Sequence, residues 1–196
     1  MNKPNNYEKV QASGEFIPLE LGGHILVIKQ VDELKSKNGK PMLKVSFDTS
    51  DADKQPHYFA DQFRNDIRPD KKWPNNGVCY ILTEDEHGNC SKSFKTFTTS
   101  VEKSNAGFSV VWGDGFAQCF KNKLIGGVFG IVEEEYNGNR SKKHKLRWFR
   151  STEKIAEADI PEAKLLPVAS SAPMMTPGTD GFMNIPEGLE EELPFN

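Results

Sequence analysis

Apolar and polar residues alternate in two regions of the chain, and a turn sequence interrupts each region. In the first, an apolar run at residues 24–31 and an alternating run at 42–47 lie on either side of Asn38-Gly39. In the second, Asn137-Gly138 precedes an alternating run at 142–150. Asn-Gly between two apolar runs is typical of a β-hairpin with a short turn. The pattern therefore predicts two β-hairpins.

The segment between the hairpins mixes strand and helix patterns. Short apolar runs bounded by polar residues predict strands at 57–63 and 78–83. Apolar residues recur at helical spacing within 94–107, and weaker helical patterns occupy 114–126 and 152–160. About five strands around a helical insertion predict a mainly β fold, a five-stranded OB-type barrel. A mixed α+β sandwich is the alternative.

The two ends of the chain differ in composition from the middle. Residues 1–15 are polar and aperiodic, which predicts a flexible arm before a domain at 16–166. Residues 167–196 contain five prolines and no Lys or Arg, which predicts a disordered linker and tip.

The net charge of this tail differs from that of the rest of the chain. The tail holds five of the 28 acidic residues, so the rest of the chain has 25 basic against 23 acidic residues and a net charge of +2. A basic body beside an acidic tail favours a polyanionic ligand for the body.

Residues that could carry catalysis or hold a metal are not arranged as those functions require. Ser100-x-x-Lys103 lies on a predicted amphipathic helix and has no companion motif. The three cysteines are widely spaced, and no Cys/His cluster could complete a zinc site. We therefore expect a protein that is not an enzyme and has no cofactor. The lack of a signal peptide and of a long apolar run further predicts a cytoplasmic protein.

The densest group of cations is the sequence NRSKKHKLRWFR at residues 139–150, which contains six Lys or Arg residues and two aromatic rings. Strict alternation places Lys143, Lys145, Arg147 and Phe149 on one face of the strand, and it places Trp148 in the core. The first face could bind phosphates through its cations and stack a base on Phe149. The same pattern also fits a solvated outer strand neutralised by the glutamates at 133–135 across the hairpin.

A polar loop and two predicted strands supply further binding candidates. Lys72 and Trp73 stand together in a loop rich in Pro and Asn, where the ring either stacks a base or packs the loop onto the body. Lys44 and Tyr58 are predicted to point away from the core by strand alternation. The residues predicted to bind nucleic acid are thus Lys44, Tyr58, Lys72, Trp73, Lys143, Lys145, Arg147 and Phe149.

The C-terminus ends in GLEEELPFN, an acidic run followed by an apolar tip. Together with the linker and the predicted OB-type body, this tip resembles the bacterial single-stranded DNA-binding proteins, whose acidic tips end in Pro-Phe. Within the body, GGVFGIVEEEYNGN and RWFRSTEKI are similar to phage-encoded members of that group. Here Asn196 follows Phe195, so the terminal carboxylate is displaced by one residue.

The resemblance implies sequence-independent binding of single-stranded DNA by the body, in phage replication and recombination. It also implies that the tip recruits replication and recombination proteins through Glu190, Glu191, Glu192, Leu193, Pro194 and Phe195. A homo-oligomer is compatible with the resemblance, and a membrane partner is not expected. The alternative function is a protein-binding adaptor, or an inhibitor of a host nucleic-acid enzyme.

Overall fold

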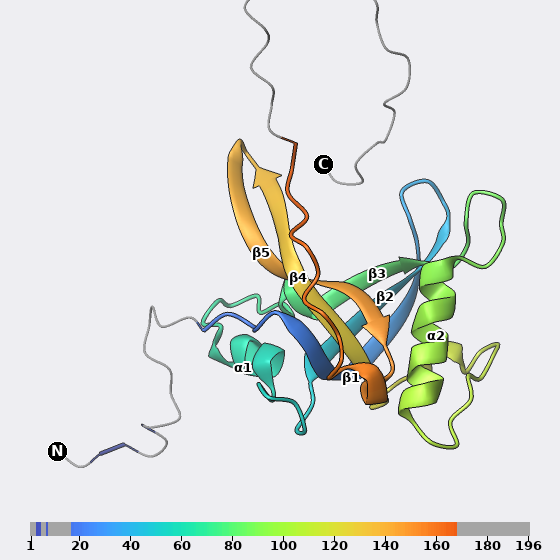
Figure 1. Ribbon diagram of the computed structural model, residues 1–196, viewed down its shortest axis with the longest axis horizontal. Coiled ribbons are helices and arrows are strands. Elements are labelled where there is room, and N and C mark those ends of the chain that lie inside the picture. The colour runs from blue at the N-terminus through green and yellow to red at the C-terminus, as the bar shows by residue number, and fades with distance from the viewer. Residues whose placement is uncertain (1–2, 5–6, 8–16, 168–196) are drawn as a thin grey trace, which may run out of the picture.

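The computed structural model describes residues 3–4, 7 and 17–167 (Figure 1). The elements follow one another as β1 (Gly22–Lys35), β2 (Pro41–Thr49), α1 (Tyr58–Asn65), the 3₁₀ turn η2 (Asn75–Gly77), β3 (Val78–Leu82), α2 (Lys92–Ser104), α3 (Phe116–Cys119), β4 (Leu124–Tyr136), β5 (Asn139–Arg150) and the 3₁₀ turn η3 (Thr152–Lys154). The predicted linker and acidic tip lie outside the described residues, apart from Pro167 at the start of the linker.

All five strands belong to one antiparallel sheet with the order β3-β2-β1-β4-β5. Strands β1, β2 and β3 form a three-stranded meander, and the β4–β5 hairpin pairs with the other edge of β1, with α2 inserted between β3 and β4, as in the partly open OB-type barrel. No ladder joins the two outermost strands, β3 and β5, within residues 17–167. The mainly β, OB-type prediction is confirmed, with the barrel left open at that seam.

Both predicted hairpins are present. In the first turn, Gly39 has a φ of 76°. In the second, Asn137 and Gly138 have φ values of 50° and 75°. Two consecutive residues with positive φ match the twist of antiparallel strands, and Asn-Gly adopts this conformation at low cost. Turn chemistry together with the flanking apolar runs was therefore enough to locate both hairpins.

The helix α2 is confirmed, but the prediction of a strand at 57–63 is wrong. This segment is helix α1, which begins where Asp48 Oδ1 accepts hydrogen bonds from the backbone N–H of Phe59 (2.9 Å) and Ala60 (3.2 Å). A carboxylate there satisfies N–H groups that a helix start leaves free. Phe59 is fully buried and anchors the helix to the core. The cap comes from β2, so the sequence of the segment itself contains no sign of it.

The predicted helix at 114–126 is also mostly wrong. Only Phe116–Cys119 is helical, and Leu124 already begins β4. Leu124 is paired with Val27 of β1, so sheet pairing overrides the weak helical spacing. The predicted helix at 152–160 is reduced to η3.

The core is built mainly from phenylalanine rings. Phe47, Phe59, Phe97, Phe120 and Phe129 are all fully buried. The ring of Phe47 makes edge contacts with those of Phe59 (5.7 Å between centroids) and Phe129 (6.2 Å). Such arrangements add stability beyond the buried area, about 0.5–1.5 kcal/mol per pair.

The chain that follows η3 covers the edge of β4. β1 pairs with β4 only as far as Phe129, so the edge of β4 beyond that residue is open. Lys164 fills it, donating its N–H to the Ile131 carbonyl (2.9 Å) and accepting from the Glu133 N–H (2.8 Å). Figure 1 shows this segment running along the protruding β4–β5 hairpin. Close approach requires glycine at position 126, where a Cβ would lie 2.9 Å from the Ile155 side chain and 3.0 Å from a backbone carbonyl oxygen.

Candidate functional site

The outer face of β1, β2 and β3 presents three rows of side chains to solvent. Leu43, Val45 and Ile81 of these strands are buried, so their neighbours along each strand point outward. The strand register aligns the outward residues in rows, Gln30-Ser46-Val78, Asp32-Lys44-Tyr80 and Leu34-Met42-Leu82. We call these nine residues the β1–β3 face.

The β1–β3 face combines exposed apolar groups with one cation, Lys44, and one carboxylate, Asp32, which opposes Lys44 from β1. Tyr80 is 53% exposed, and Leu34 and Leu82 are each 42% exposed. Lys44 stands directly opposite Tyr80 across the strand pair. Directly opposed residues have Cβ atoms about 4.5–5.5 Å apart, so the ammonium group and the phenol ring can contact the same ligand. Among the described residues, no ion pair within 4.0 Å involves Lys44.

The turn between β1 and β2 borders this face and carries Lys37 and Lys40, next to Lys35 at the end of β1. The turn is closed by hydrogen bonds from the Ser36 N–H to the Lys40 carbonyl (2.8 Å) and from the Lys40 N–H to Ser36 Oγ (3.0 Å). Three cations are therefore held at one end of the β1–β3 face, where they add to the charge of Lys44.

The prediction for the basic strand needs correction. Phe149 is only 6% exposed and packs in the core against Phe97 (5.4 Å between ring centroids), whereas Trp148 is 40% exposed. The cause is a β-bulge: Val128 is paired with Trp148 but the next residue of β4, Phe129, is paired with Leu146. The extra residue shifts the alternation, as bulges do. The predicted outward position of Phe149 and core position of Trp148 are both wrong.

The cations of the same strand have partners within the protein. Glu134 accepts from Lys145 and forms an ion pair with Lys143 (3.2 Å). The hydrogen bond from Lys145 is the main reason that the pKa of Glu134 is lowered, although burial opposes it. Arg147 donates to the Glu162 carbonyl (3.0 Å). For Lys143 and Lys145, the structure thus shows the second interpretation of the sequence, in which glutamates across the hairpin neutralise the cations of the strand.

The loop candidates divide in a similar way. Trp73 is half-buried, its ring lies 5.7 Å from that of Phe63, and its indole N–H donates to the carbonyls of Phe47 and Gly77 (both 3.2 Å). The ring therefore packs the loop onto the body, the second of the two interpretations. Lys72 is exposed. Tyr58 lies on α1 rather than on a strand and is half-buried, and burial raises its pKa.

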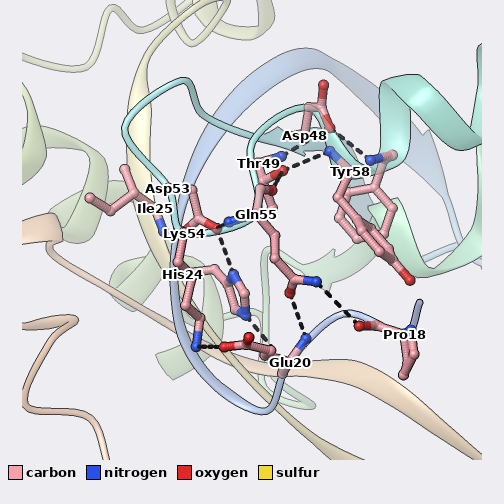
Figure 2. Close-up of polar contacts among 11 residues, drawn as sticks. Pro18, Glu20, His24, Ile25, Asp48, Thr49, Asp53, Lys54, Gln55 and Tyr58 are labelled. Atoms are coloured by element: carbon pink, nitrogen blue, oxygen red, sulfur yellow. Dashed lines mark hydrogen bonds and ion pairs between the residues drawn. The ribbon is translucent and has the colours of Figure 1, made fainter. Parts of the chain in front are cut away.

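A buried polar network holds the loop after β2 against β1 (Figure 2). His24 is 1% exposed, and its Nδ1 lies 2.8 Å from Asp53 Oδ1 while its Nε2 lies 3.0 Å from the Glu20 carbonyl. Asp53 also accepts from the backbone N–H of Ile25 (2.6 Å) and Gln55 (2.9 Å). Burial raises the pKa of the Asp53 carboxyl, but these hydrogen bonds outweigh it and leave the pKa below its ordinary value.

The same network positions the segment before β1 and the start of α1. Gln55 accepts from the Glu20 N–H (2.7 Å) and donates to the Pro18 carbonyl (3.3 Å). Thr49 Oγ1 accepts from the Tyr58 N–H (2.8 Å). Figure 2 shows Gln55 between the strand end at Thr49 and the chain at Pro18. Backbone and side-chain groups from three segments are thus fixed relative to one another.

Tyr80 is the residue that the sequence reasoning missed. The run Val78-Cys79-Tyr80-Ile81-Leu82 was predicted as a strand. Alternation along this strand places Tyr80 on the face opposite to that of Ile81. This signal could have identified the ring as outward-facing. Lys44 was predicted to point outward, and it does so beside Tyr80.

The described residues contain no group of three or more His, Cys, Asp or Glu side chains that could hold a metal ion. None of their helices has the length and apolar character needed to cross a membrane. Burial raises the pKa of the Cys79 thiol to about 12, so it is not a nucleophile at neutral pH. Comparison of the whole chain with protein-family models and with curated proteins finds no match.

Proposed function

We propose that this protein binds single-stranded DNA without sequence preference through the β1–β3 face, and that its acidic C-terminal tip recruits replication and recombination proteins. The observation that carries the first part is the placement of Tyr80 directly opposite Lys44 on the open face of an OB-type sheet. Proteins of this architecture bind oligonucleotides on the strand 2–3 face and the adjacent loops.

The chemistry of the face suits a single strand better than a duplex. The bases of a single strand are free to stack on an exposed ring, whereas a duplex offers mainly phosphates. Exposed Tyr80, Leu34 and Leu82 offer apolar contact that every base can use. Lys44 and the lysines of the adjoining turn supply cations for the phosphates. Stacking and phosphate contacts carry no base identity, so we expect little sequence preference.

The size of the face supports a short footprint. Three strands about 4.8 Å apart span about 10 Å, and four residues along a strand span about 13 Å. A stacked strand rises about 3.4 Å per nucleotide, so the face accommodates about four nucleotides. This is at the lower end of the range of about 4–16 nucleotides for one OB fold.

Titration of a labelled oligo(dT) with the full chain tests the proposal. We expect binding that weakens as salt increases, because neutralised phosphates release counterions. Unlabelled oligo(dT) should compete well, and duplex DNA of the same length should compete poorly. The absence of binding at low salt, or binding that salt does not change, would contradict the proposal.

The second part of the proposal concerns the tip, and its support is the sequence of residues 190–195. An anionic run steers a basic partner, and an apolar ring after it can fill a pocket. The linker starts beside the β4–β5 hairpin, where Arg140 donates to the Pro167 carbonyl (3.0 Å). Deletion of residues 187–196 should leave oligo(dT) affinity unchanged or slightly increased, while abolishing capture of replication proteins. A marked loss of DNA affinity on deletion would count against this role.

A further inference from the structure

A cavity lies at the open seam of the barrel, away from the β1–β3 face. It has a volume of about 170 Å³ and lies between the chain before β1, helix α1, the turn η2 and strand β5. Its lining residues are Pro18, Leu19, Tyr58, Phe59, Asn76, Lys142, Lys143 and His144. We call it the seam pocket. We propose that the seam pocket holds one nucleobase of the bound single strand, with the neighbouring phosphate on Lys142; this rests on the proposed function.

The inner part of the seam pocket is apolar and aromatic. Leu19 is 3% exposed and Phe59 is fully buried, and both belong to the core. The rings of Tyr58 and Phe59 contact edge to face, with centroids 5.1 Å apart. An apolar cavity of about 150 Å³ is large enough for benzene. The seam pocket therefore has room for one six-membered aromatic ring, the size of a pyrimidine base.

The opening of the pocket is cationic and carries polar groups. Lys142 is exposed. Its cross-strand neighbour, Glu133, accepts a hydrogen bond from the Leu166 N–H (3.0 Å). Within residues 17–167, no carboxylate lies within ion-pair distance of Lys142 and none lines the pocket. The carboxamide of Asn76 can donate to and accept from the edge of a base. This combination recognises a planar ring next to an anion.

The walls of the pocket are fixed before any ligand arrives. Nδ1 of His144 contacts the Leu19 carbonyl, which joins β5 to the chain before β1. The polar network of Figure 2 holds that chain through the exposed hydrogen bond from Gln55 to the Pro18 carbonyl, and it holds Tyr58 through Thr49. A site whose walls are already ordered loses little entropy on binding.

The position of the pocket connects it with the β1–β3 face. Asn76 lies in η2, which leads directly into β3, and Tyr80 follows four residues later. Because this stretch begins in a 3₁₀ turn, its four residues span at most about 13 Å. At about 3.4 Å per stacked nucleotide, a strand on the face reaches the pocket within about four nucleotides.

Thymidine 5′-monophosphate is the probe that tests the pocket directly. In ¹H–¹⁵N spectra of the full chain, it should shift the amides of Leu19, Asn76 and His144 and saturate at millimolar concentration. Ribose 5-phosphate, which lacks the base, should shift them much less. Asn76→Phe fills the pocket and should abolish the shifts, whereas Asn75→Phe, at the exposed neighbouring position, should preserve them. Lys142→Ala, an exposed change that does not threaten folding, should weaken nucleotide binding about threefold.

Oligo(dT) binding then decides whether the pocket serves the strand. Asn76→Phe should weaken binding of a twenty-nucleotide oligo(dT) about tenfold relative to Asn75→Phe. If oligo(dT) binds normally to Asn76→Phe, the pocket proposal is wrong while the proposed function stands. If oligo(dT) does not bind the unmodified chain, the proposed function fails first. One further outcome would overturn the proposal. In that outcome, thymidine monophosphate binds neither the full chain nor the chain without residues 187–196, whereas the deletion alone shifts the pocket amides. The occupant of the pocket is then the tip.

Discussion

Replacing Tyr80 should separate stacking from charge in DNA binding. The ring is 53% exposed and opposes Lys44, so its removal costs the fold only a cross-strand pair, about 0.2–1 kcal/mol. One base stacked on an aromatic side chain contributes about 1–3 kcal/mol. Tyr80→Ala should therefore lower affinity for oligo(dT) by about 5- to 150-fold. The salt dependence should stay the same, because no charge is lost.

Lys44→Ala provides the complementary change. Loss of one phosphate contact should reduce the slope of log affinity against log salt by about 0.7. Fluorescence anisotropy at four or more salt concentrations measures the affinity for oligo(dT) and its salt dependence. Tyr80→Phe is the control that retains the ring, and Lys95→Ala is the control on the exposed side of α2. The reasoning fails if Tyr80→Ala binds within twofold of the unmodified protein, or if Tyr80→Phe loses as much affinity as Tyr80→Ala.

Three further predictions test the fold. Asp53→Asn should destabilise the protein by about 1–3 kcal/mol, because the buried carboxylate contacts His24 and accepts from two backbone N–H groups. The pKa of Asp53 is lowered in the fold, so its stabilising contribution should be complete above about pH 4 and lost as pH falls below it. Urea unfolding at several pH values measures this contribution, and equal stability of the two proteins at pH 7 would contradict it. Phe149→Ala should cost about 3–5 kcal/mol and Trp148→Ala only about 1 kcal/mol, and thermal unfolding with the opposite order would refute the bulge. Iodoacetamide at pH 8 should label exposed Cys90 quickly and leave Cys79 unlabelled, and rapid mass-spectrometric labelling of Cys79 in the folded protein would contradict its raised pKa.

The errors of the sequence-based predictions share a physical origin. The strand predicted at 57–63 is a helix because a carboxylate from another strand caps it. Phe149 and Trp148 exchange their predicted environments because a bulge adds one residue to β5. The alternation of residues in one strand does not reveal a bulge, because a bulge is defined by the pairing with the neighbouring strand. The indole N–H of Trp73 donates to the carbonyl of Phe47, 26 residues away, and to that of Gly77, four residues away. Only the contact with Phe47 depends on how segments far apart in the sequence pack together.

The sequence by itself determined the two hairpins, helix α2 and the mainly β class, because Asn-Gly turns and apolar periodicity act between residues close in the chain. It also identified Lys44 as an outward cation. Only the tertiary structure decided which aromatic side chain stands next to Lys44, which lysines of β5 are neutralised by glutamate, and where the seam pocket forms. Those properties depend on strand register and on contacts between segments far apart in the sequence, where a shift of one residue moves every side chain to the opposite face.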